Sequence, residues 1–335
     1  MGVKVVRDAV VHQFFASASR NALLGHIGAL EKALQRYSAN PSIVPPRIVR
    51  DTPKSGTLHM IMPVIDDTYC GVKTLGFNPN GNTGFVGSVN VVEPDSGALV
   101  GVVDAKVLTA VRTAMSSCIG LLKFIDLLGP SVTVTVYGTG LQAFWHLFLA
   151  SRLLEGKDVS ANILYRSKRM ESKELERYFP KLKINQINVS DSAQVSDVVA
   201  KSGIIFGCIP SERPSILAAY LDKEGAPFTY VSLIGSYKPH MHECDESLIN
   251  YFKDQKAGII VDSTNDSLLE SGELIDAKVA PEQLVELGKL SENSKNLKAL
   301  FPHQRQVVLS KIVGIAIMDV SVASGLLQSM ANESD

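Results

Sequence analysis

A glycine-rich segment in the middle of the chain sets the fold class more firmly than any other part of the sequence. The apolar run Val132 to Tyr137 leads directly into Gly138-Thr139-Gly140-Leu141-Gln142-Ala143, and a helix-spaced stretch continues to Leu154. Glycines between a strand and a helix permit a tight turn, and they let a pyrophosphate approach the N–H groups of the helix N-terminus. The segment predicts a dinucleotide site formed by Gly138, Thr139, Gly140, Leu141 and Gln142.

Short apolar runs and helical stretches alternate after this turn. We expect a helix near Glu171 to Tyr178 and strands at Asn162 to Tyr165, Gly203 to Cys208, Thr229 to Ile234 and Gly258 to Val261. Such alternation indicates a parallel sheet with helices on both faces. The predicted fold class is α/β, with a Rossmann-type doubly wound sheet.

The residues before the turn have a different texture. Apolar residues at three- and four-residue steps predict helices over Ser19 to Tyr37 and Val107 to Ile125. A last apolar helix is expected from Gln306 to Leu327, packed back on this first part of the chain. Runs rich in β-formers predict an antiparallel or mixed sheet from Leu58 to Met62, Tyr69 to Leu75, Phe85 to Val92 and Ala98 to Val103.

These patterns divide the 335 residues into two domains, the number that this chain length favours. We expect an α+β domain over residues 1–125, completed by residues 310–335. The Rossmann domain is expected over residues 126–309.

The composition argues against polyanionic partners and membranes. Lys and Arg total 33 and Asp and Glu total 34, so the formal charge of −1 offers no basic field for nucleic acid or an anionic membrane. Residues 127–151 carry no formal charge, but Pro130, Gly138 and Gly140 interrupt them. We interpret this stretch as a buried strand and helix rather than a membrane span.

Neither the cysteines nor the histidines form a metal motif. The four cysteines include no C-x-x-C pair, which disfavours a zinc site and a disulfide framework and makes the reducing cytoplasm the expected compartment. His240 and His242, followed by Glu243, alternate along a loop and lack the spacing of a helical zinc motif. We therefore expect no metal.

The end of the strand after the glycine turn bears on the choice of cofactor. An acidic residue there binds the ribose 2′-hydroxyl of NAD, whereas cations accommodate the 2′-phosphate of NADP. The chain has Tyr165-Arg166-Ser167-Lys168-Arg169 and no carboxylate. We expect NADPH, with NADH as the alternative, and contacts from Arg166, Ser167 and Lys168. The alternative is a basic turn that is solvated and binds no cofactor, because such a turn has the same sequence pattern.

Several motifs, taken in order, resemble the ornithine cyclodeaminase/μ-crystallin family over about residues 45 to 320. They are Pro46-Arg47, Gly71-Val72-Lys73, Leu108-Thr109-Ala110-Val111-Arg112-Thr113, the glycine turn, Ile234-Gly235-Ser236, Val261-Asp262, Glu270-Ser271-Gly272-Glu273-Leu274, and Val313-Gly314-Ile315-Ala316 with Asp319. The resemblance implies an enzyme whose first domain, completed by the C-terminal helix, supplies the substrate contacts and a homodimer interface. Members of this family act on small amino acids or cyclic imino acids with a nicotinamide, so the resemblance implies such a substrate here.

The resemblance also implies roles for individual residues. Arg47, Lys73 and Arg112 match the family positions that hold the substrate, and two guanidiniums and an ammonium suit a carboxylate. Lys73 is the candidate catalytic residue, because it could supply or relay a proton. Asp262 and Asp319 could each orient substrate or cap structure. Further cofactor contacts are implied for Ser88, Arg112, Thr113, Cys208, Ile209, Pro210, Ile234, Gly235, Ser236 and Val313.

One departure from the family pattern points to a branch. Where cyclodeaminases and alanine dehydrogenases carry a catalytic Asp after Gly-Gly or Gly-Ala, this chain has Tyr237, a poor base near neutral pH. The segment resembles the ketimine reductases instead. We expect NAD(P)H-dependent reduction of Δ1-piperideine-2-carboxylate or Δ1-pyrroline-2-carboxylate to the cyclic amino acid. The alternatives are a cyclodeaminase or amino-acid dehydrogenase of the same family, and a non-catalytic NADPH-binding protein.

Overall fold

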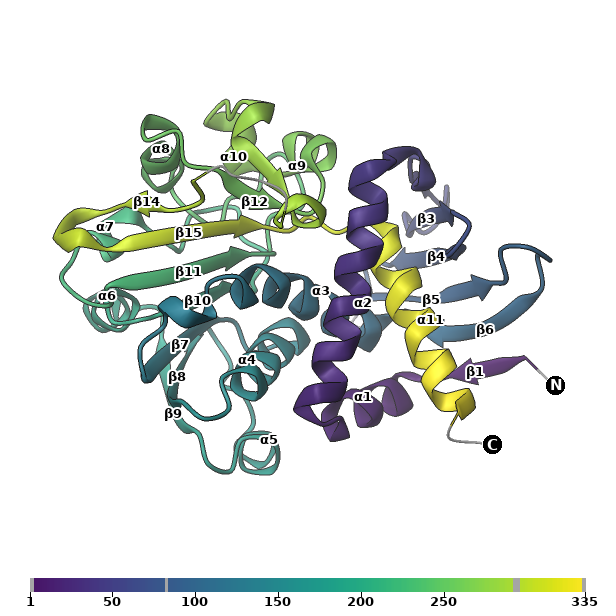
Figure 1. The fold of residues 1–335 in the computed structure, drawn as a ribbon, viewed down its shortest axis with the longest axis horizontal. Helices are drawn as coiled ribbons and strands as arrows, with labels where there is room; N and C mark the ends of the chain where they lie inside the picture. Colours follow the sequence, from purple (N-terminus) through teal and green to yellow (C-terminus); the bar gives the residue numbers. More distant parts are fainter. Residues whose placement is uncertain (1–2, 82–83, 292–295, 333–335) are drawn as a thin grey trace. The chain divides into compact units, whose positions relative to one another are not determined.

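The computed structural model describes residues 3–81, 84–291 and 296–332 and divides into two compact units (Figure 1). Unit 1 comprises Met1–Thr113 and Gly314–Asp335, and unit 2 comprises Ala114–Val313. Residues 1–2 and 333–335, which we assigned to the first domain, lie outside the described part. The division between the units falls inside helix α3 (Ala105–Leu122). This helix is long and apolar enough to cross a membrane, but 83% of it is buried inside the protein.

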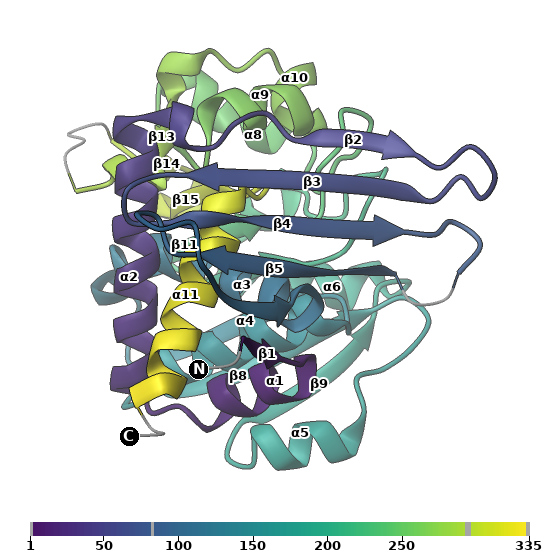
Figure 2. The ribbon, with the colours of Figure 1, turned by 90° about the vertical axis from the view of Figure 1, so that its right-hand side faces the viewer.

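Unit 1 is a six-stranded sheet with helices on one face (Figure 2). The strand order is β1-β6-β5-β4-β3-β2; β1 pairs with β6 in parallel and all other neighbours are antiparallel. Helix α11 (Ala316–Asn332) packs against β3 to β6 and against α2 (Arg20–Ala39), and α1 spans Asp8–Ser17. The strands are β1 (Lys4–Val6), β2 (Ile48–Asp51), β3 (Leu58–Ile65), β4 (Cys70–Phe77), β5 (Phe85–Val92) and β6 (Leu99–Asp104). The mixed sheet and helix α2 agree with the sequence pattern, which did not predict α1.

Local chemistry explains where α2 begins and which face it buries. The Ser19 hydroxyl accepts a hydrogen bond from the Ala22 N–H and so caps the first turn. Leu23, Ile27 and Leu30 recur at helical spacing and are buried. The C-terminal helix therefore meets an apolar stripe within unit 1.

Unit 2 is a nine-stranded sheet in the order β13-β12-β15-β11-β10-β7-β8-β9, with β14 paired to β15. All neighbours on the main path are parallel, and β14 is antiparallel to β15. The strands are β7 (Ser131–Tyr137), β8 (Asp158–Tyr165), β9 (Lys183–Asn188), β10 (Ile204–Gly207), β11 (Phe228–Leu233), β12 (Ile259–Val261), β13 (Leu284–Glu286), β14 (Ala299–Leu300) and β15 (Gln306–Lys311). The helices are α4 (Leu141–Leu153), α5 (Ser172–Tyr178), α6 (Ser192–Ala200), α7 (Ala218–Leu221), α8 (Glu246–Asp254), α9 (Thr264–Glu270) and α10 (Gly272–Asp276). The doubly wound fold class is confirmed, and its strand order reverses between β7 and β10.

The single helix expected from Gln306 to Leu327 is wrong. The structure instead forms strand β15 between β11 and β12, and α11 begins only at Ala316. Gly314 separates the two with φ +95°, a left-handed conformation that favours glycine. A strand buried on both faces has no alternation of apolar and polar residues, so its apolar run cannot be told from a helix by periodicity.

Candidate active site

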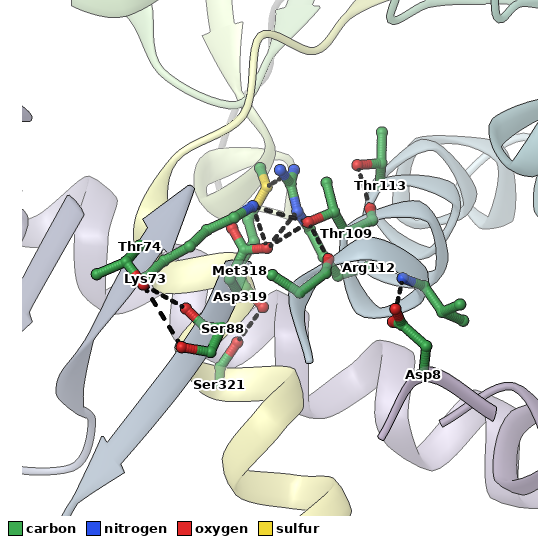
Figure 3. A network of polar contacts seen from close by, with 12 residues as sticks. Asp8, Lys73, Thr74, Ser88, Thr109, Arg112, Thr113, Met318, Asp319 and Ser321 are labelled. Atoms are coloured by element: carbon green, nitrogen blue, oxygen red, sulfur yellow. Dashed lines mark hydrogen bonds and ion pairs between the residues drawn. The ribbon is translucent and has the colours of Figure 1, made fainter. Parts of the chain in front are cut away.

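Unit 1 brings two of the three predicted substrate cations onto one carboxylate (Figure 3). Lys73 comes from β4, Arg112 from α3, and Asp319 from the first turn of α11. The Lys73 Nζ lies 2.6 Å from Asp319 Oδ1, and the Arg112 Nε lies 3.1 Å from the same oxygen. Thr109 contributes a hydroxyl 2.8 Å from Lys73 Nζ. Strand, helix and C-terminal helix thus meet at one buried polar centre.

Burial changes the acidity of Lys73. Its side chain is 1% exposed, and this desolvation lowers its pKa to about 8. The charge of Asp319 acts in the opposite direction, while the positive charges of Arg112 and Arg47 add to the lowering. A lysine with this pKa is mostly protonated at neutral pH and can still release its proton, which suits a general acid.

Asp319 holds the opposite charge of the centre. Burial acts to raise its pKa, but the charges of Arg112 and Lys73 and their hydrogen bonds outweigh this and hold the pKa below its usual value. The carboxylate is therefore ionised at neutral pH. Together with Arg47, the three cations and one carboxylate leave a net charge of +2. A residual positive charge in a buried place favours an anionic ligand.

Arg47 belongs to the same surroundings. It precedes the edge strand β2 and is half-buried, and its charge acts on Lys73. The Thr113 hydroxyl donates to the Thr109 carbonyl within α3, which places it one turn along the helix. Ser88 lies elsewhere. Its hydroxyl pairs with Thr74 at 3.4 Å, on the face of the sheet opposite to Lys73.

The glycine turn in unit 2 has the geometry that its sequence predicts. Gly138 has φ +113°, and a Cβ there would stand 2.9 Å from Ile209 Cγ2. Gly140 is the N-cap of α4 with no side-chain cap, so backbone N–H groups alone define this helix N-terminus. Thr139 lies in the turn, and Leu141 and Gln142 form the first helical positions. This geometry, a positive-φ glycine followed by a helix N-terminus with free N–H groups, suits a phosphate.

The basic segment after β8 is exposed. Arg169 stacks on Tyr165, with its guanidinium 5.3 Å from the ring, and Lys168 lies 3.8 Å from Glu171. Arg166 and Ser167 are exposed, and among the described residues Arg166 has no ion pair. Arg166 is therefore a cation at the carboxyl end of β8 that is exposed and available to a ligand.

The remaining predicted cofactor residues lie at the carboxyl ends of β10, β11 and β15. Cys208, Ile209 and Pro210 follow β10, and Ile234, Gly235 and Ser236 follow β11. Burial raises the pKa of Cys208 well above its usual value, which makes it a poor nucleophile. Val313 follows β15, and its N–H donates to Asp262 Oδ1. The structure thus separates the two aspartates: Asp262 binds backbone, whereas Asp319 joins the cations.

Tyr237 and the neighbouring histidines lie on the loop after β11. Tyr237 is half-buried, and burial raises its pKa, so the phenol stays neutral near pH 7. His242 Nε2 lies 2.8 Å from Asp276 Oδ2, and His240 lies 3.9 Å from Glu212. In the described ranges no three His, Cys, Asp or Glu side chains form a metal-binding group.

Sequence reasoning missed a second buried charged group, in unit 2. It comprises Lys311, Glu243 and Glu273, which lie on β15, on the loop after β11 and on α10. The only signal in the sequence is a charged residue at the end of an otherwise apolar run, as at Lys311. Nor does the sequence indicate that the Thr109 hydroxyl accepts a hydrogen bond from Lys73.

Comparison with known proteins identifies the family of the chain. A sequence profile of the ornithine cyclodeaminase/mu-crystallin family matches residues 7–334. The uncharacterized protein YGL159W of Saccharomyces cerevisiae is 37% identical, with 98% of this chain and 97% of that protein covered. The ketimine reductase mu-crystallin of Macropus fuliginosus is 26% identical over 91% of each chain. A structure of Thermococcus litoralis Δ1-pyrroline-2-carboxylate reductase with NADH and L-proline has the same fold, with TM-score 0.73, 18% identity, and 99% of this chain and 98% of that chain covered. The chain therefore belongs to the ornithine cyclodeaminase/mu-crystallin family.

Proposed function

We propose that the protein reduces a cyclic ketimine carboxylate to the cyclic amino acid with NADPH. The substrates that fit are Δ1-piperideine-2-carboxylate and Δ1-pyrroline-2-carboxylate. The observation that carries the proposal is the buried centre of Lys73, Arg112 and Asp319, which combines an anion-binding charge with a lysine of lowered pKa. The relatives named as ketimine reductase and pyrroline-2-carboxylate reductase support it.

The substrate carboxylate binds to the arginines of unit 1. Asp319 neutralises one of the three positive charges of Lys73, Arg112 and Arg47, so a net charge of +2 remains to attract the carboxylate. A guanidinium binds a carboxylate through two parallel N–H groups, and this fixes the orientation of the ring. Arg47 and Arg112 therefore position the substrate, while Asp319 holds Arg112 at its Nε.

Lys73 handles the proton. NADPH, when bound, supplies a hydride to the carbon of the C=N bond, whose electron pair moves to nitrogen. The nitrogen must carry a proton for this step, and the Lys73 ammonium can donate one because its pKa is about 8. No strong base is needed in this direction. A neutral phenol at Tyr237, in place of a carboxylate, is compatible with reduction and disfavours ammonia elimination.

The cofactor binds to unit 2. The turn at Gly138 lacks room for a Cβ and leads into the uncapped N-terminus of α4, which suits a pyrophosphate. Arg166, with Ser167 and Lys168 beside it, would hold the 2′-phosphate of NADPH. The absence of a carboxylate in this segment supports NADPH over NADH.

We also propose a homodimer that forms through the face of the unit 1 sheet opposite to α2 and α11. This face carries exposed isoleucines. Ile48 and Ile61 are register partners on neighbouring strands and are 53% and 44% exposed, and Ile65 is 65% exposed. Exposed apolar patches of this kind mark interaction surfaces.

The proposed compartment is the cytoplasm. All four cysteines are free thiols. Unpaired cysteines are typical of a reducing compartment.

A turnover assay tests the proposed function. The purified protein is mixed with NADPH and, in parallel, with the five-membered ketimine, the six-membered ketimine and ornithine. Loss of NADPH absorbance with a ketimine is the expected result. Ammonia release from ornithine without net NADPH consumption would support a cyclodeaminase instead. Binding of NADPH with no turnover of any compound would support a non-catalytic binder.

A further inference from the structure

A buried charged cluster lies under the loop that follows β11. Lys311 Nζ is 3.2 Å from Glu243 Oε2 and 3.5 Å from Glu273 Oε1, and all three side chains are at most 2% exposed. The Ser236 hydroxyl donates to Glu273 Oε1 at 2.6 Å and accepts from Lys311 at 2.5 Å. We call these four residues the Lys311 cluster.

The cluster is bound directly to the backbone of the loop. Glu243 Oε2 accepts hydrogen bonds from the N–H groups of Gly235, at 2.6 Å, and Ser236, at 3.1 Å. A Cβ on Gly207 or Gly235 would stand 2.5 or 2.8 Å from Glu243 Oε1, so the two glycines leave the space that this carboxylate fills. A Cβ on Gly235 would also overlap the Ile209 carbonyl. The carboxylate therefore holds the backbone of the loop after β11 by hydrogen bonds and packs against Gly207 at the end of β10.

Stability alone does not account for this arrangement. One cation faces two carboxyl groups, and all three side chains are at most 2% exposed. Burial raises the pKa of Glu243 to about 7 despite the charge of Lys311. Among the described residues Glu243 Oε1 and Glu273 Oε2 have no hydrogen-bond partner. Apolar side chains of similar size commonly stabilise a core at least as well as buried ion pairs.

The position of the loop suggests what the cluster is for. A doubly wound sheet binds a dinucleotide with one nucleotide on each side of the point where strand order reverses. That point lies between β7 and β10, and the basic segment that suits the adenosine phosphate follows β8. The loops after β10 and β11 are therefore on the nicotinamide side.

We propose that the Lys311 cluster positions the loop Ile234–Tyr237 to receive the nicotinamide half of the cofactor. Glu243 acts through the backbone of Gly235 and Ser236, and Glu273 acts through the Ser236 hydroxyl and Lys311. Both are positioning residues that touch no reacting atom. This inference rests on the proposed binding of NADPH to unit 2.

The test compares a whole cofactor with half of it. Dissociation constants for NADPH and for adenosine 2′,5′-bisphosphate, which lacks the nicotinamide, are measured for the full chain and for Glu243→Gln and Glu273→Gln. Each variant is expected to bind NADPH about tenfold more weakly, because a charged hydrogen bond is lost, with the bisphosphate unchanged. Glu273→Gln carries the test if Glu243→Gln does not fold.

Arg305→Gln is the matched control. Arg305 is equally buried in unit 2 but binds the carbonyls of Ala200 and Ala226, before the start of β15. It is expected to lower the melting temperature without changing the ratio of the two dissociation constants. The inference is overturned if the glutamine variants leave NADPH affinity unchanged, or weaken both ligands equally. Failure of the unmodified protein to bind either ligand would refute the proposed function instead.

Discussion

Lys73 Nζ and Asp319 Oδ1 lie 2.6 Å apart although their residues are 246 positions apart in the sequence. This ion pair joins strand β4 to helix α11 inside unit 1. The same carboxylate oxygen accepts from Arg112, so a change in Asp319 acts on both cations.

The first prediction concerns the pH dependence of the reaction. The acid form of Lys73 is the active form, so kcat/KM should be level below pH 8 and fall as the pH rises through about 8. Asp319→Asn removes a charge that raises the pKa of Lys73, and the fall should therefore begin at a lower pH. The measurement is kcat/KM between pH 6 and about 10 at saturating NADPH.

Lys73→Arg provides the control for this profile. A guanidinium keeps its charge throughout the range, so the fall near pH 8 should disappear even though activity is reduced. The imine of the free substrate has the same pKa whichever variant is assayed. Differences between the pH profiles of the variants therefore report the titration of Lys73. An unshifted fall in both variants would remove Lys73 from the proton transfer.

The second prediction concerns the carboxylate of the substrate. Arg112→Ala should raise KM for the ketimine at least about tenfold, since a charged bidentate contact is lost. Arg50→Ala is the matched control, because Arg50 is an exposed arginine of the same unit whose side chain donates to the Val49 carbonyl. Initial rates across ketimine concentrations give the result, and equal KM values for both variants would exclude the arginine clamp.

The third prediction concerns cofactor choice. Arg166→Asp should weaken NADPH binding by about one to two orders of magnitude, because it replaces a phosphate-binding cation with an anion. NADH binding should change little or improve, since a carboxylate can bind the ribose 2′-hydroxyl. Fluorescence titration with both cofactors measures this. If Arg166→Asp still prefers NADPH over NADH, the basic turn does not bind the 2′-phosphate and is only solvated.

The fourth prediction concerns the uncovered face of unit 1. Ile61→Lys places a charge beside the exposed Ile48 on the proposed interface and should convert the dimer to a monomer. Leu269→Lys is the matched control, because Leu269 is 69% exposed on α9 of unit 2. Sedimentation equilibrium should report a dimer for the parent chain and the control. A monomeric parent chain would contradict the proposed interface.

The parts of the fold that the sequence predicted have local causes. The turn at Gly138 needs a particular backbone geometry, and its neighbours Val132 to Tyr137 have strand-forming side chains. The helix from Ser19 has both a cap and an apolar stripe. Such signals lie within a few residues of one another, so a single sequence displays them.

The parts that the sequence did not predict depend on distant contacts. Strand β15 is buried between β11 and β12, and only this neighbourhood distinguishes it from the start of a helix. Asp319 had two open roles because its partners lie on β4 and α3. The pairing of Lys311 with Glu243 and Glu273 likewise joins three separate elements, and no pattern along the chain reveals it.

Isotope transfer tests the central claim most directly. The six- and five-membered ketimines are each incubated with NADPH that carries deuterium at C4 of the nicotinamide, on one face and then on the other. The account predicts that one labelled form gives a cyclic amino acid with a single deuterium on the carbon that bears the carboxylate, as read by mass spectrometry. Product without deuterium from both forms, or no product beside normal NADPH binding, would contradict it.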